Sequence, residues 1–151
     1  MKLKIYNSKR NKWIYTKLRN SYVKEFHTFI KEVKTFSDVD LHGIRPLELF
    51  KIYEGYDDTL IILSRRKKCQ AFIQFTRYDD YTFVNYLYVK KSQRKRGYAN
   101  RLLNMIKADV IQLYCQPENK TAQNFYANLG FKKMPESEFP NLERLELRRF
   151  L

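Results

Sequence analysis

The fold is decided by Tyr86-Leu87-Tyr88-Val89-Lys90-Lys91-Ser92-Gln93-Arg94-Lys95-Arg96-Gly97-Tyr98-Ala99, which joins an apolar strand to a basic loop and then to a helix. Six of the twelve positions from 90 to 101 are lysine or arginine, and none is a carboxylate. A helix start offers backbone N–H groups and the positive end of the helix dipole, and Gly97 would let a ligand approach closely. The pattern therefore predicts an anion site that suits a diphosphate; a basic loop that is merely solvated is the alternative.

Three strands are predicted before this loop, at Thr59–Ser64, Cys69–Tyr78 and Tyr81–Val89, from their β-branched, aromatic and alternating residues. The alternation in the second strand puts Ala71, Ile73 and Phe75 on one face and Phe72 and Gln74 on the other. The charged connection Arg65–Lys68 and the turn Asp79–Asp80 are short. The three strands should therefore form an antiparallel meander.

After the helix, an apolar strand is predicted at Val110–Cys115. A second helix should begin after Asn119, which can cap it, and should end at Gly130 in the left-handed conformation. Strands are predicted at Phe131–Met134 and Leu142–Phe150. Because a helix separates the meander from the strand 110–115, a parallel crossover is expected there, and the sheet should be mixed.

The N-terminal part should supply an opening strand within Leu3–Lys17 and two helices. Apolar residues at helical spacing predict the first from Leu18 to an end near Thr35-Phe36. Pro46 suits the first turn of the second, which should end by Glu54-Gly55. We therefore expect one domain over residues 1–151, of α+β class with an α/β-like crossover. It should hold a single mixed, mostly antiparallel sheet of about six to seven strands and about four helices.

Composition limits the classes of function. The chain has 151 residues, a formal net charge of +14 and 44% hydrophobic residues, enough for one core. A strongly basic chain attracts nucleic acid, anionic membranes or phosphorylated ligands, although scattered lysines can also serve only solubility.

Metal chemistry and membrane insertion are not expected. The two cysteines, Cys69 and Cys115, lie in apolar runs and should be buried thiols. No CxxC pair, Cys/His cluster or HExxH motif is present, and there are only two histidines. No apolar stretch has the length of a signal peptide or a membrane span, so a soluble cytoplasmic protein is expected.

Two motifs together identify a family resemblance. Arg94–Ala99 fits Arg/Gln-x-x-Gly-x-Gly/Ala, and Asn119–Phe131 fits Asn-x-x-Ala-x-x-x-Tyr-x-x-x-Gly-Phe. In this order, with an apolar strand before the first motif and an apolar helix after it, the chain resembles the GCN5-related N-acetyltransferases (GNAT). The matching elements cover roughly Thr59–Phe131.

The resemblance implies acetyl-CoA as co-substrate. In that family, backbone N–H groups of the loop hold the pyrophosphate, and the preceding strand leaves its neighbour at a bulge and pairs with the pantetheine arm. Carried over, the pyrophosphate residues are Arg94, Lys95, Arg96, Gly97, Tyr98 and Ala99. The residues facing the acetyl and pantetheine portion are Leu87, Tyr88 and Val89.

The resemblance also assigns catalytic roles. Tyr126 should protonate the departing thiolate, because a phenol with a pKa of about 10 stays protonated at neutral pH. The alternative is that Tyr126, one of twelve tyrosines, only packs its helix onto the sheet. Asn119 should contact the pantetheine, cap the helix, or do both. The backbone N–H of Tyr88 or Val89 should stabilise the oxyanion.

The chain departs from the family at the general base. Many relatives carry a glutamate in the strand equivalent to Tyr81–Val89, and this strand has no acid. Proton removal must therefore use water or another group. The candidates elsewhere are Asp38, Asp40, His42, Glu54, Asp79, Asp80, Glu136 and Glu138.

The expected function is transfer of an acetyl group from acetyl-CoA to a primary amine, on a protein lysine, a protein N-terminus or a small molecule, by direct attack in a ternary complex. The alternative is a weakly active or inactive protein of the same fold that binds acetyl-CoA, nucleic acid or both. An acidic rim of Asp38, Asp40, Glu136, Glu138 and Glu143 favours a cationic amine. The strand Leu142–Phe150, if it lies at the sheet edge, would favour a homodimer.

Overall fold

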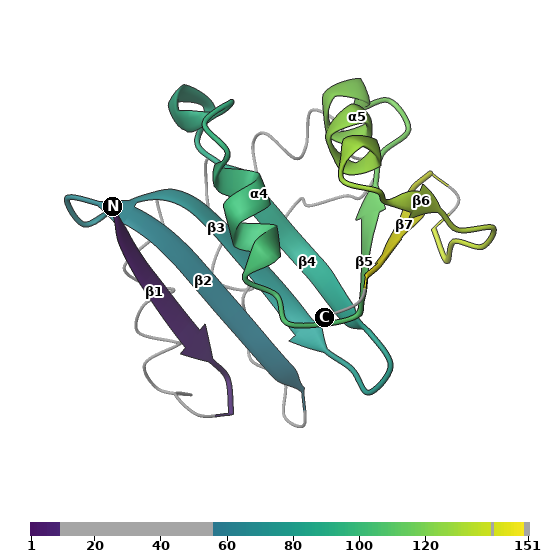
Figure 1. Cartoon of the computed structure of the whole chain (residues 1–151), viewed down its shortest axis with the longest axis horizontal. Helices are drawn as coiled ribbons and strands as arrows, with labels where there is room; N and C mark the ends of the chain where they lie inside the picture. The colour runs from purple at the N-terminus through teal and green to yellow at the C-terminus, as the bar shows by residue number, and fades with distance from the viewer. Residues whose placement is uncertain (10–55, 140, 150–151) are drawn as a thin grey trace, which may run out of the picture.

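The computed structural model describes residues 1–9, 56–139 and 141–149. Seven strands form one sheet in the order β1-β2-β3-β4-β5-β7-β6 (Figure 1). The strands are β1 (Lys2–Asn7), β2 (Asp57–Arg65), β3 (Lys68–Arg77), β4 (Thr82–Val89), β5 (Val110–Cys115), β6 (Lys132–Lys133) and β7 (Glu143–Arg148). β4 and β5 pair in parallel and the other neighbours pair antiparallel, so the predicted mixed, mostly antiparallel sheet is confirmed.

Two α-helices lie within the described residues, α4 (Tyr98–Asn104) and α5 (Lys120–Asn128), and the 3-10 helix η1 (Lys91–Gln93) precedes α4. Both α-helices lie on the same face of the sheet (Figure 1). Neither described helix is long and apolar enough to cross a membrane. The helices expected at about 18–36 and 45–54 fall outside the described residues, so the total of about four stays a prediction.

The core lies between this sheet face and the two helices. Ile73 and Phe75 of β3 belong to one buried cluster with Leu102 of α4 and with Ile106, which lies just after that helix. Phe72 is buried on the opposite face, where its ring lies 5.5 Å from that of Tyr88. The predicted alternation in this strand is therefore confirmed, and it fixes which side of β4 faces the helices.

The last strand does not meet the condition that was set for a homodimer, because it does not lie at the edge of the described sheet. β7 pairs with β5 along its length, from Cys115↔Glu143 to Val110↔Arg148, and β6 pairs with its other side at Leu145 and Glu146. Among the described strands, β1 and β6 form the edges. The reason proposed for a homodimer therefore no longer holds for this strand.

The charged connection between β2 and β3 is a tight two-residue turn. Arg65 pairs with Lys68, and the two residues between them have positive φ, 53° at Arg66 and 64° at Lys67. Two left-handed residues in succession are the feature of a type I′ turn, for which Asn-Gly is the preferred pair. Arginine and lysine are disfavoured in this conformation, because each carries a Cβ that crowds the backbone.

Exchanging this pair for Arg66→Asn/Lys67→Gly should therefore stabilise the protein. We expect a gain of about 1 to 2 kcal/mol in the free energy of unfolding, and a rise of about 3 to 6 °C in the thermal midpoint. The matched control is Arg66→Ala/Lys67→Ala, which removes the same two charges but keeps both Cβ atoms. An equal rise in the control would mean that relief of charge repulsion, not of backbone strain, is responsible.

Candidate functional site

The strands β4 and β5 part in the middle of the sheet. Their parallel pairing is limited to Thr82–Val84 against Ile111–Leu113, and beyond it the two strands diverge (Figure 1). The register of β4 against β3 also shifts at this point: Phe75 pairs with Val84 and Gln74 with Tyr86, which leaves Asn85 as a bulged residue. The bulge and the divergence expected for this strand are confirmed.

The backbone of β4 is oriented so that two of its amides point into this gap. Lys90 N donates to Gln70 O of β3 at 2.8 Å. Since hydrogen-bonded and non-hydrogen-bonded pairs alternate in an antiparallel ladder, the Tyr88 amide also points toward β3. The amides of Leu87 and Val89 point the other way, toward the divergence. Of the two amides expected to stabilise an oxyanion, the orientation favours Val89.

The basic loop follows β4 directly. Arg94 Nε donates to Val89 O at 3.0 Å, which ties the loop to the end of the strand. Lys95 has a positive φ of 64° and Gly97, the N-cap of α4, a φ of 82°. The exposed cations of the loop and the first helix turn are Lys90, Lys91, Arg94, Lys95, Arg96 and Arg101.

Gly97 faces open space. A Cβ added there would meet no atom within 4 Å. The first turn of α4 contains no acidic residue, and no side chain caps it. Backbone N–H donors and cations therefore border open space at this loop. A diphosphate needs such an arrangement, so the residues present fit that group.

Helix α5 is positioned by its two ends. Asn119 Oδ1 accepts a hydrogen bond from Ala122 N at 3.2 Å, so the predicted cap is confirmed. Gly130 has a φ of 100°, as expected for the residue that ends the helix. Between these ends the ring of Tyr126 packs edge-on against Phe125 and Phe131, with centroids 5.3 Å away in each case.

The Tyr126 hydroxyl lies near the divergent end of β5. Burial raises its pKa well above that of an ordinary phenol, and the nearby Cys115 of β5 raises it further. Burial and the neighbouring Glu143 raise the pKa of the Cys115 thiol to about 11. Both groups are therefore protonated at neutral pH, and Tyr126 can serve as a proton donor. Cys69 and Cys115 are buried thiols, as predicted.

None of the predicted bases among the described residues is buried. Asp79, Asp80, Glu136 and Glu138 are all exposed. Asp38, Asp40, His42 and Glu54 lie outside the described residues. Within the described part, no group of histidine, cysteine, aspartate and glutamate side chains could hold a metal ion.

One carboxylate was missed by the sequence analysis. Asp58 is 5% exposed, and burial raises its pKa, against the lowering effect of a hydrogen bond from Thr76. The predicted strand starts one residue later, at Thr59, but β2 begins at Asp57. The alternation of Asp58 with Leu60 and Ile62, which share its sheet face, is the signal that would have placed it inside.

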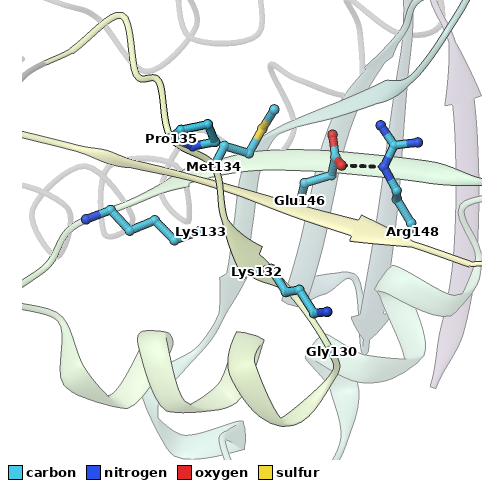
Figure 2. Close-up of a pocket in the computed structure, with 7 residues that line it drawn as sticks. All are labelled: Gly130, Lys132, Lys133, Met134, Pro135, Glu146 and Arg148. Carbon is cyan, nitrogen blue, oxygen red and sulfur yellow. Dashed lines mark hydrogen bonds and ion pairs between the residues drawn. The ribbon is translucent and has the colours of Figure 1, made fainter.

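Two hollows lie at the other end of the sheet. Figure 2 shows the first, of about 290 Å³, between β6 and β7, where Arg148 Nε is 2.6 Å from Glu146 Oε1. None of the predicted cofactor residues lines it. The second, of about 250 Å³, borders the loop at 135–139 and includes Arg144 and Glu143. Glu143 lies 3.6 Å from Lys133 Nζ, which partly offsets its charge in the proposed acidic rim.

Known proteins share both the sequence pattern and the fold. Residues 56–133 match the family model described as an acetyltransferase (GNAT) domain. No curated protein sequence matches the chain.

Three solved structures illustrate the structural likeness. An acetyltransferase from Streptococcus agalactiae has a TM-score of 0.69 at 16% identity, over 97% of this chain and 98% of that one. A GNAT-family acetyltransferase from Staphylococcus aureus Mu50 has a TM-score of 0.67 at 17% identity, over 97% and 99%. The PaiA N-acetyltransferase from Thermoplasma acidophilum, solved in complex with coenzyme A, has 0.64 at 15% identity, over 99% and 100%. At such identities the likeness establishes the shared fold.

Proposed function

The chain belongs to the GNAT family of acetyltransferases and is an acyltransferase enzyme, and on that premise we propose that it transfers the acetyl group of acetyl-CoA to a primary amine by direct attack in a ternary complex. The observation that carries the proposal is the divergence of β4 from β5 beside the open, basic loop at Gly97. We propose that the whole chain forms this one domain.

In this proposal the loop residues 94–99 bind the pyrophosphate of acetyl-CoA. The strand residues Leu87, Tyr88 and Val89 lie along the acetyl and pantetheine portion, together with Asn119. The amine attacks the thioester carbonyl, the Val89 amide donates to the oxygen on which negative charge develops, and the C–S bond breaks. Tyr126 gives its proton to the sulfur, and the proton lost by the amine passes to water.

Two measurements test this function. Calorimetry should give a dissociation constant for acetyl-CoA in the micromolar range, about −8 kcal/mol. Thiol release should then depend on an added amine, with a panel of lysine, spermidine, tyramine and glucosamine as probes. Absence of acetyl-CoA binding would refute the proposal, and binding without amine-dependent thiol release would leave only a binding protein.

The basic surface supports a second candidate, a binder of nucleic acid with or without acetyl-CoA. The net charge is +14, and Arg65, Arg66, Lys67 and Lys68 are all exposed in one turn. Electrostatic binding of this kind weakens steeply with salt. A fluorescence titration with a short single-stranded oligonucleotide over a salt series would detect it, and the thiol-release assay separates it from the enzyme.

We further propose that the acceptor is a cationic amine drawn in by the acidic rim. The variant Glu136→Gln/Glu138→Gln should raise the acceptor KM about two- to fivefold at low salt, and the difference should shrink at high ionic strength. The control Glu136→Asp/Glu138→Asp keeps both charges and should keep the wild-type KM. An unchanged KM in the glutamine variant would refute the proposal that the acidic rim attracts the acceptor. The rim residues Asp38 and Asp40 lie outside the described residues.

A further inference from the structure

A series of side-chain hydrogen bonds crosses β2, β3 and β4. These three strands are neighbours in the sheet (Figure 1). Thr76 Oγ1 donates to Asp58 Oδ1 at 2.6 Å, and Asn85 Nδ2 donates to Thr76 Oγ1 at 2.8 Å. Asp58 and Thr76 are each 5% exposed, whereas Asn85 is exposed. These hydrogen bonds therefore link a buried carboxylate to an amide that solvent and ligands can reach.

The Asp58 carboxylate fixes which group donates and which accepts in each of these hydrogen bonds. An ionised carboxylate can only accept hydrogen bonds, and a hydroxyl has one proton to donate. Because Thr76 gives its proton to Asp58, it can only accept on its other side, and Asn85 must turn its NH₂ group toward it. The Asn85 Oδ1 atom therefore points away from Thr76. It accepts no hydrogen bond from the residues that the structure describes.

Asn85 stands where the two central strands part. It is the bulged residue of β4, and it follows Val84, the last residue of β4 that pairs with β5. Its partner Thr76 alternates with Phe75, which faces the helices, so the Asn85 side chain lies on the opposite sheet face. Tyr126 approaches the same divergence from the helix side.

We propose that the Asn85 amide oxygen accepts a hydrogen bond from the acceptor amine and holds it for attack, with Thr76 and Asp58 as positioning residues that keep the amide turned. This inference rests on the proposed acetyl transfer. An attacking nitrogen must aim its lone pair at the carbonyl carbon, and an acceptor that holds one N–H fixes that orientation. An amide cannot take up the proton, so Asn85 orients the amine and does not replace the missing base.

The test uses the most active of the four probe amines named above. Asn85→Ala and Thr76→Val should each lower kcat/KM for that amine about tenfold, the loss expected for one hydrogen bond. Thr76→Ser keeps the hydroxyl and should retain most of the activity. Acetyl-CoA affinity by calorimetry should not change in any of these variants, because the amide acts only on the amine.

Two further variants isolate the positioning role. If Thr76 acts only through Asn85, the double variant Asn85→Ala/Thr76→Val should be no slower than Asn85→Ala alone. The control Thr82→Val removes an equally buried hydroxyl, 3% exposed, from the start of β4, and should behave as wild type. Additive losses, or an equal loss of acetyl-CoA affinity, would overturn the inference. A wild-type protein that acetylates none of the four amines would instead overturn the proposed function.

Discussion

Replacing Tyr126 by phenylalanine should lower kcat for acetyl transfer by about 10²- to 10³-fold, the range expected when a general acid is removed. The hydroxyl lies near the end of β5 that diverges from β4, where the thiolate would leave. The KM for acetyl-CoA should stay within about twofold, because the bonds that hold the cofactor are assigned to the loop and β4. Steady-state thiol release at saturating acetyl-CoA measures both parameters.

The Tyr126→Phe substitution should remove the hydroxyl without disturbing the packing around the ring. The Tyr126 ring keeps its edge-on contacts with Phe125 and Phe131, and its hydroxyl makes no hydrogen bond within the part of the chain that the structure describes. Removing the hydroxyl therefore leaves no buried partner unsatisfied, and the thermal midpoint should change little. The matched control is Tyr78→Phe, which alters a tyrosine whose pKa is also raised by burial but which lies at the turn before β4. If both variants kept wild-type kcat, Tyr126 would be a packing residue only.

The pH dependence provides a second readout. Because the pKa of Tyr126 is raised, the acid form persists to a higher pH than in a free phenol, and the wild-type kcat should show no decline from its ionisation below about pH 10. The phenylalanine variant should be slow at every pH. A wild-type decline centred near neutral pH that disappears in the variant would contradict the assigned protonation state.

The parts of the site that could be predicted from sequence are those fixed by local chemistry. The Asn119 side chain can cap a helix by accepting a hydrogen bond from the backbone N–H three residues later, at Ala122. Gly130 can take a positive φ at the end of the same helix. Alternation in β3 divided its residues between the two sheet faces, both of which are buried, without knowledge of its neighbours. These features depend on few residues close in sequence, so the pattern carries enough information.

The features that could not be predicted depend on contacts between distant segments. The burial of Asp58 follows from its pairing with Thr76 across the β2–β3 ladder, and the place of β7 inside the sheet follows from its pairing with β5. The Arg66-Lys67 turn contains neither glycine nor asparagine, so its left-handed backbone follows from the two-residue connection that the register requires. Register is set by the whole sheet, and sequence spacing alone does not reveal it.

The second large effect is expected at Gly97, where alanine should weaken acetyl-CoA binding about 10- to 100-fold. A Cβ at a φ of 82° is strained, so the backbone would rotate and displace the N–H groups at the start of α4. The new methyl group would also project into the open space in front of the loop. Loss of one hydrogen bond to a charged phosphate is worth about 1.5 to 3 kcal/mol, which sets the expected range. Calorimetry with acetyl-CoA measures it.

Gly130→Ala provides the matched control, because Gly130 is also a left-handed glycine at a helix end, with a φ of 100°. A Cβ there would meet Leu147 Cδ1 at 3.4 Å, an ordinary contact. Both variants should therefore lose a similar free energy of unfolding, about 1 kcal/mol, from the same backbone strain. Only the Gly97 variant should lose affinity for acetyl-CoA. If the two variants bound acetyl-CoA equally well, the loop at 94–99 would not be the pyrophosphate site, and its positive charge would have to serve a different ligand.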